Sequence, residues 1–484
     1  MRFFLFIILS VGLMACSQND SQGANTSTTS SENTNSESNG PLKIDITVEG
    51  MSGGSAYLIG MYTDQNFRVD SVGVDAQGRF TFEKEEGVPS GLYFVLFPDN
   101  RNFQLLIDKE QQFSVTTKNN QLSNAVVVKG NKETELLYET RKKENPINNS
   151  LNAVSAQMNG LDKNSPAYED LKLQQKKILK QKQDMLDEVF AKHPNSFFTS
   201  FKRSGQNPTV GDYYKEDGTE DNIKKLYEYR KEFWTNVDLT DERLIRTPVI
   251  SNKLKRFIKD LTIQNPDSLK VSIDYLMDRV ENVPAYYQYF TVWMINNYEP
   301  NETKLMDSQA IFVHMVKNYH TVEKATWSTP AETGGLQQRA DEMKLSLVGL
   351  QGPDVVSTDQ YGNKKSIYEM DQDYIVVYMY NPDCEHCQEE TPKLMKFYNE
   401  WKQNGLGVFA IAIDTDDTKW KNYINSNRLQ EWTHVYDPTN KSIYGKYFVD
   451  VTPEIYLLNP ERKIIAKNLK THQIITMIEQ DKNN

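Results

Sequence analysis

A seven-residue stretch late in the chain, residues 381–387, constrains the fold most because it carries a Cys-x-x-Cys pair between two hydrophobic patterns. A continuous apolar run, residues 374–380, precedes it, and a run rich in β-branched and aromatic residues predicts a buried central strand. Leu394, Phe397 and Trp401 follow at the spacing of an amphipathic helix. The sequence therefore places both thiols where a buried strand turns into the first turn of a helix.

This placement predicts different roles for the two cysteines. Unpaired backbone N–H groups and the positive end of the helix dipole point at Cys384, and a helix N-terminus lowers the pKa of a thiol. Cys384 is therefore the predicted nucleophile, and Cys387, one turn into the helix, is the predicted buried resolving thiol. Such a pair closes a strained, easily reduced disulfide, and bonds of this kind tend to be catalytic.

Features on either side of the pair resemble the thioredoxin fold. They are the strand, the two cysteines, Pro392 five residues later, and Thr452-Pro453 ahead of an apolar run at 455–458. More narrowly, residues 345–484 resemble the TlpA/ResA-like thiol-disulfide oxidoreductases.

Two further positions bear on this resemblance. The family's opening segment, which contains Gly, Pro and Asp, is matched at residues 352–356, and Glu390 stands where the family often has a glutamate. The resemblance implies that Glu390 relays a proton to Cys387; a surface charge is the alternative. Asp383 replaces the family's usual aromatic residue before the first Cys, which leaves partner preference and redox poise open.

The resemblance also implies how a substrate is held. The peptide bond before Pro453 is expected to be cis, as a deliberate tight turn, and Thr452 and Pro453 are expected to bind the substrate backbone as a short strand. No cofactor is implied beyond the redox-active disulfide formed by Cys384 and Cys387.

The role of His386 stays open at this point. It lies between the cysteines, as in oxidising members of the superfamily, and a protonated imidazole there would stabilise the Cys384 thiolate. Asp383 and Glu385 oppose this effect with negative charge. A solvated loop residue is the alternative interpretation.

Other chemistries of paired cysteines fit less well. A structural zinc site needs four ligands, but there is no second Cys pair and the histidines are scattered (His193, His314, His320, His386, His434 and His472), so no metal is predicted. A peroxiredoxin needs Thr or Ser three residues before its reactive Cys, and a copper chaperone uses a longer Cys spacing. A redox-dead scaffold usually loses one Cys. Dithiol–disulfide exchange is therefore favoured.

Length and charge narrow the classes further. The chain has 484 residues, which predicts two to four domains. Its net charge of −11 argues against nucleic-acid binding, which favours basic patches. It has three cysteines, so a protein outside the cytosol would have only one close thiol pair, free for chemistry.

The first 16 residues predict a lipoprotein signal peptide. A positive start is followed by an apolar run too short for a membrane span. The run ends Leu13-Met14-Ala15-Cys16, which resembles a bacterial lipobox and implies cleavage before Cys16 and lipidation of that residue. Several acyl chains would anchor the protein stably; an ordinary signal peptide with a chance Cys is the alternative.

Residues 17–41 are predicted to be a disordered polar tether, because Ser, Asn, Thr and Gln cannot bury a core. Ser17, by analogy with lipoproteins generally, indicates sorting to the outer membrane. We therefore expect a lipid-anchored protein of the cell envelope, on the outer membrane and facing the periplasm.

Residues 42–130 are predicted to form an antiparallel β sandwich or barrel, because short alternating segments are separated by turn signals. A spacer or dimerisation scaffold and a docking module are both consistent with this domain.

Residues 131–340 are predicted to form an all-α domain. Ser165-Pro166 predicts the start of a long helix, with a solvated face or a coiled-coil seam. The aromatic stretch at 284–300 predicts core, with an exposed substrate groove as the alternative. Residues 328–335 are expected to act as a hinge into the last domain.

Residues 341–484 are predicted to form an α/β thioredoxin fold. Strands are expected at 407–414, at 433–437 and on both sides of Asn459, with helices after Asp417, near Ser442 and from His472. Strands alternating with helices and ending in a hairpin match the thioredoxin order.

Two functions of different classes follow. The first is a membrane-tethered periplasmic thiol-disulfide oxidoreductase that exchanges disulfides with partner proteins of the envelope, with a membrane-bound thiol donor as a further candidate partner. The second is a lipid-anchored protein-binding scaffold whose thioredoxin domain senses redox state.

Overall fold

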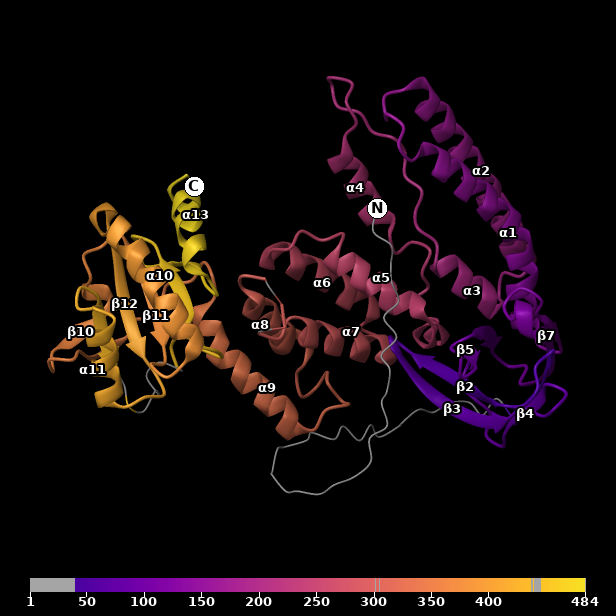
Figure 1. Ribbon diagram of the computed structural model, residues 1–484, viewed down its shortest axis with the longest axis horizontal. Helices are drawn as coiled ribbons and strands as arrows, with labels where there is room; N and C mark the ends of the chain where they lie inside the picture. Colours follow the sequence, from indigo (N-terminus) through magenta and orange to yellow (C-terminus); the bar gives the residue numbers. More distant parts are fainter. Residues whose placement is uncertain (1–39, 301, 304, 437, 439–444, 484) are drawn as a thin grey trace. The chain divides into compact units, whose positions relative to one another are not determined.

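The computed structural model (Figure 1) describes residues 40–300, 302–303, 305–436, 438 and 445–483. The predicted signal peptide with Cys16, the tether as far as residue 39 and the helix expected near Ser442 lie outside the described residues. Within the described ranges, no helix combines the length and the apolar character needed to cross a membrane.

The first part of the described chain forms two four-stranded sheets, ordered β4-β1-β7-β8 and β3-β2-β5-β6. Apolar residues alternate along the first strand, and buried side chains of both sheets belong to one hydrophobic cluster. The strands are β1 (Leu42–Glu49), β2 (Ser55–Tyr62), β3 (Gln65–Gly73), β4 (Arg79–Lys84), β5 (Gly91–Leu96), β6 (Asn102–Ile107), β7 (Gln112–Lys118) and β8 (Val127–Lys129).

The prediction of a purely antiparallel sandwich is wrong at one strand pair. β1 runs parallel to β7, with Ile44 opposite Phe113 and Ile46 opposite Val115. Parallel neighbours need a long connection, and the chain between β1 and β7 passes through the second sheet before it returns. Local alternation of apolar residues specifies which face is buried but not which strand becomes the neighbour.

Helices follow the sheets, as predicted. They are α1 (Lys132–Met158), α2 (Pro166–Lys192), α3 (Phe197–Ser204), α4 (Asn222–Glu232), α5 (Pro248–Lys259), α6 (Pro266–Val280), α7 (Pro284–Asn297), α8 (Ser308–Tyr319) and α9 (Pro330–Met343). Ser165 caps α2 as expected, because its side chain accepts a hydrogen bond from the N–H of Tyr168. α2 lies alongside α1 (Figure 1).

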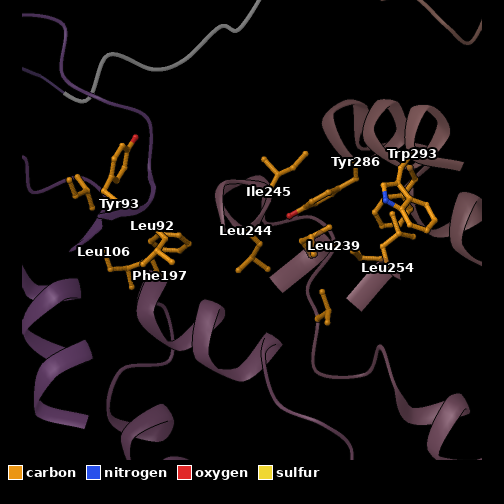
Figure 2. Close-up of a cluster of buried hydrophobic side chains, with 14 of the residues drawn as sticks. Leu92, Tyr93, Leu106, Phe197, Leu239, Leu244, Ile245, Leu254, Tyr286 and Trp293 are labelled. Atoms are coloured by element: carbon orange, nitrogen blue, oxygen red, sulfur yellow. The ribbon is translucent and has the colours of Figure 1, made fainter. Parts of the chain in front are cut away.

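The aromatic stretch on α7 lies in the core, so that prediction is confirmed. Tyr286, Phe290 and Trp293 are buried, and Figure 2 shows Tyr286 and Trp293 among buried leucines. The same hydrophobic cluster also contains Leu92 and Phe197, so the sheets and the helices share one continuous core.

The expected hinge at 328–335 is wrong. Thr329 caps α9 with a reciprocal capping box to Glu332, and Pro330 occupies the first turn. Gly334 and Gly335 therefore lie inside a helix, because two strong local start signals outweigh the low helix propensity of the glycines.

The C-terminal region is an α/β unit around a seven-stranded sheet, ordered β10-β9-β13-β12-β11-β14-β15. The central strand β11 pairs in parallel with β12 and antiparallel with β14. Strands alternate with helices along the chain and end in the β14–β15 hairpin, as predicted. The elements are β9 (Val356–Thr358), β10 (Lys364–Ser366), β11 (Tyr374–Tyr380), α10 (Glu385–Trp401), β12 (Leu406–Ala412), α11 (Asp417–Ser426), β13 (Thr433–Tyr436), β14 (Glu454–Leu458), β15 (Ile464–Ala466) and α13 (Thr471–Lys482).

The two faces of this sheet carry separate cores. Alternate β11 residues such as Tyr378 pack with Cys387 and Leu394 of α10, while Val377 and Tyr456 belong to the cluster on the opposite face. Every residue of β11 is buried. The cysteine pair thus lies at the carboxyl end of a strand that is fixed on both sides.

Candidate active site

The turn between β11 and α10 places the first cysteine at a helix N-terminus, as predicted. The Asn381 side chain accepts a hydrogen bond from the Asp383 N–H (2.8 Å), and the Cys384 N–H donates to the Asn381 carbonyl (3.0 Å). Cys384 then occupies the N-cap position with extended backbone, and the helix begins at Glu385. Polar Asn-Pro-Asp therefore ends the strand and aims the first N–H groups of α10 at the Cys384 sulfur.

Cys384 lies at the half-exposed rim of the site. Its thiol donates a hydrogen bond to the Thr452 carbonyl, with an S···O distance of 3.3 Å. Partial burial alone would raise the pKa of Cys384, but hydrogen bonds from the Thr452 side chain and the N–H groups of Cys387 and His386 outweigh it, so the pKa is lowered. This thiol is therefore suited to form a thiolate.

Cys387 lies at the floor of the site and is fully buried. Burial raises its pKa to about 12, although a backbone hydrogen bond from Asn381 acts in the opposite direction. The Tyr423 hydroxyl donates to the Cys387 carbonyl (3.1 Å) and lies at hydrogen-bond distance from the Thr391 hydroxyl (2.7 Å), which also contacts the Tyr378 hydroxyl (2.8 Å). The floor is thus closed by three hydroxyl groups that hydrogen-bond to one another.

The peptide bond between Thr452 and Pro453 is cis, which confirms the expected backbone geometry. This turn precedes β14, the antiparallel neighbour of β11, and so reaches the cysteines from a distant part of the sequence. Thr452 and Pro453 are half-buried and remain open to a bound molecule. Their role in substrate binding stays a prediction.

Glu390 is not an exposed surface charge, which is the alternative interpretation of this residue. It is buried, and its Oε1 accepts hydrogen bonds from the N–H (2.9 Å) and the hydroxyl (2.6 Å) of Thr471 at the start of α13. Its Oε2 lies 3.1 Å from Lys393 Nζ. Burial would raise the pKa of Glu390, but these hydrogen bonds outweigh it and the pKa is lowered. The carboxylate is therefore ionised at neutral pH, and its proton relay stays a prediction.

His386 contributes its backbone to the site. Its N–H helps to lower the pKa of Cys384, whereas its ring is exposed and lies 4.0 Å from Glu389 Oε2. Asp383 is engaged by Lys419, with 2.6 Å between the charged atoms. The side chains beside Cys384 are thus directed to other partners at the surface.

Sequence reasoning missed two charged residues behind the Thr452-Pro453 turn. Glu454 and Lys467 are both buried; burial raises the pKa of Glu454 and lowers that of Lys467. In each case the sequence signal for burial is a charged residue at the end of a buried apolar run. Glu454 is the first residue of β14, and Lys467 directly follows β15. Across the described parts of the chain, no group of three or more His, Cys, Asp or Glu converges as a metal site.

Family comparisons divide the chain into three matched parts. Residues 348–467 match the AhpC/TSA family, residues 42–137 match a domain of unknown function, DUF4369, and residues 218–332 match another, DUF5106. The cysteine pair and the Thr452-Pro453 turn therefore fall within the AhpC/TSA match.

The chain is also similar to curated relatives and to solved structures that are described as thiol-disulfide oxidoreductases or as a thioredoxin-like protein. The chain is 25% identical over 128 residues to the thiol-disulfide oxidoreductase ResA of Bacillus anthracis, covering 26% of this chain and 72% of the relative. The thioredoxin domain of a thiol-disulfide oxidoreductase from Bacteroides vulgatus is 28% identical and covers 28% of this chain and 96% of its own, with a TM-score of 0.26. A thioredoxin-like protein from Bacteroides caccae is 18% identical and covers 57% and 98%, with a TM-score of 0.45.

Proposed function

We propose that this chain carries out dithiol–disulfide exchange with partner proteins through Cys384 and Cys387. Its C-terminal region is a thioredoxin-like domain of the AhpC/TSA family, and the chain is a thiol-disulfide oxidoreductase. The observation that carries this proposal is the asymmetry of the two thiols. One turn of α10 separates a half-exposed thiol of lowered pKa from a buried thiol of raised pKa.

The proposed reaction balances within the dithiol and one partner disulfide. The Cys384 thiolate attacks one partner sulfur, and the other partner sulfur leaves as a thiolate that takes up a proton. Cys387, after losing its proton, attacks Cys384 Sγ and releases the second partner sulfur. The pair is then oxidised to a disulfide and the partner is reduced by two electrons; the reverse sequence oxidises the partner.

Four other residues support these steps in the proposal. Thr452 and Pro453 hold the partner backbone beside Cys384, since the turn lies at hydrogen-bond distance from that thiol. Glu390, ionised at neutral pH, accepts the proton that Cys387 must lose. His386 acts through its backbone N–H, because its ring is exposed to solvent.

The exchange is proposed to take place in the cell envelope. The Leu13-Met14-Ala15-Cys16 motif and the polar tether support a lipid anchor on the outer membrane, with the body facing the periplasm. Its partners would then be envelope proteins with thiols or disulfides and a membrane-bound thiol donor. Cys16→Ser should leave the protein soluble or unprocessed; acylated membrane protein in that variant would contradict the anchor.

Trapping of mixed disulfides tests the reaction. Cys387→Ser removes the resolving thiol and should accumulate partners bound through Cys384, visible as high-mass bands that a reductant removes. Cys384→Ser is the matched control and should trap almost none. Equal trapping by both variants would contradict the assigned order of attack. Insulin reduction with dithiothreitol separates an enzyme from a redox-sensing scaffold, since a scaffold gives no turnover.

A further inference from the structure

A buried lysine lies behind the active-site turn and contacts the preceding helical region. Lys467 is fully buried; its ammonium donates hydrogen bonds to the Gln309 side chain and to the Ser346 carbonyl (2.9 Å), and it lies 3.9 Å from Asp307 Oδ1. It also sits 4.8 Å above the centre of the Tyr456 ring. A buried ammonium is costly unless it is paired and hydrogen-bonded, so its surroundings are strongly constrained.

The residue directly after Pro453 belongs to the same network. Glu454 is buried and its Oε1 accepts a hydrogen bond from the Asn468 N–H (3.0 Å). The positive charge of Lys467 stabilises the Glu454 carboxylate. The Asn468 side chain donates to the Met306 carbonyl (2.9 Å). The end of the turn is thus fixed to β15 and, through β15, to the segment that starts α8.

The beginning of the turn is fixed by the same groups from the other side. The Phe448 N–H donates to the Ser346 hydroxyl (3.1 Å), and its carbonyl accepts from the Tyr456 hydroxyl (2.8 Å). Lys467 contacts the two partners of Phe448 in these bonds, because it donates to the Ser346 carbonyl and lies above the Tyr456 ring. Residues 448–454 are therefore held at both ends, and Thr452 lies between the two attachments.

We propose that Lys467 is a positioning residue for thiol–disulfide exchange: with Glu454 and the helical residue Asp307, it holds residues 448–454 so that Thr452 faces Cys384. The proposal rests on the function proposed above. It gives the helical region a direct part in the redox site, because Asp307 and Gln309 at the start of α8 precede the thioredoxin-like region and yet complete the surroundings of Lys467.

The consequence for Cys384 follows from the contacts of Thr452. The Thr452 side chain helps to lower the pKa of Cys384. If Lys467 loses its charge, the carboxyl groups of Glu454 and Asp307 are left buried with backbone hydrogen bonds but without a cation, and the turn is expected to shift to give them water. Thr452 then moves from the sulfur, and the thiolate fraction of Cys384 falls.

The test compares Lys467→Met with Lys463→Met in the full chain. Lys463 is exposed and pairs with Glu461 on the same hairpin, so its replacement is a matched control. Alkylation of the reduced protein across pH, with peptide mapping, gives the apparent pKa of Cys384. Lys467→Met should raise it by about one unit, which is a tenfold loss of thiolate at neutral pH, while Lys463→Met should match the wild type. Equal profiles for both variants would overturn the proposal.

Asp307→Asn keeps the proposal testable if Lys467→Met does not fold. The amide retains an oxygen for the Val348 N–H (2.8 Å in the wild type) and removes the charge that faces Lys467, together with the capping hydrogen bond from the Ala310 N–H to Oδ1 (3.3 Å). A raised apparent pKa of Cys384 in this variant supports the proposal, and an unchanged one contradicts it. If the wild type itself exchanges no disulfides, the proposed function fails instead, and the comparison of thiol pKa values still decides the positioning role.

Discussion

The rim and the floor of the active site contain the same chemical group in opposite surroundings. At the rim, Cys384 meets solvent, the N–H groups of α10 and Thr452. At the floor, Cys387 meets the closed hydroxyl cluster of Tyr378, Thr391 and Tyr423. Position at the start of α10 therefore does not by itself decide which cysteine attacks and which resolves, because both lie in the first turn. Their difference in burial separates the two roles.

The largest expected effect comes from opening the floor. Tyr378 is fully buried, stacks on Tyr380 with ring centres 5.4 Å apart and contacts Thr391. Tyr378→Ala should lower the free energy of unfolding by about 3–5 kcal/mol, measured by denaturant titration. It should also admit water and lower the pKa of Cys387, which reduces the difference between the pKa values of Cys387 and Cys384.

Tyr361→Ala is the control for that experiment. Tyr361 is exposed on a loop of the same region, so its truncation should change the free energy of unfolding by at most about 0.5 kcal/mol. If Tyr378→Ala costs no more than this control, the floor is not a packed part of the core.

The second effect concerns the rim. Thr452→Val removes the hydroxyl that lowers the pKa of Cys384 while keeping the shape of the side chain. A hydrogen bond to a charged group contributes about 1.5–3 kcal/mol, so the apparent pKa of Cys384 should rise by about one to two units. Stopped-flow exchange with a disulfide peptide at neutral pH should slow by about tenfold or more. His386→Gln, which changes only an exposed ring, should leave this rate unaltered.

The smallest effect separates two roles of Glu390. Glu390→Gln weakens the charged hydrogen bonds to Thr471 and Lys393, which should cost about 1 kcal/mol of stability. Because the folded pKa of Glu390 is lowered, this contribution is present above the ordinary carboxyl pKa and disappears as the pH falls through the folded value. Melting curves from neutral to acidic pH should therefore converge for the wild type and the variant.

The relay gives a different signature in the same variant. If Glu390 takes the proton of Cys387, Glu390→Gln slows the release of the mixed disulfide without changing the first attack. Unchanged release would limit Glu390 to its contact with Thr471 at the start of α13.

Local patterns predicted the elements that carry the site. The apolar run gave β11 and the helical spacing gave α10, because both signals depend on neighbours in sequence. The same start signal, a polar cap followed by Pro, occurs at Ser165 and at Thr329 and begins a helix at both places. The sequence itself therefore carries the signal that argues against a hinge at 328–335.

Other features depend on contacts between distant segments. The parallel pairing of β1 with β7 and the meeting of Lys467 with Asp307 join residues far apart in the chain. Glu390 matched a family position, but its bond to Thr471 needed the packing of α13 against α10. Sequence patterns report which side chains are buried more reliably than which groups they meet.

Alkylation of the reduced protein across pH, followed by peptide mapping, tests the assignment of the two thiols most directly. We expect Cys384 to be modified first and with the lower apparent pKa, while Cys387 stays protected until strongly alkaline pH, in line with its pKa of about 12. Modification of Cys387 first, with the lower apparent pKa, would reverse the roles of rim and floor and contradict the mechanism.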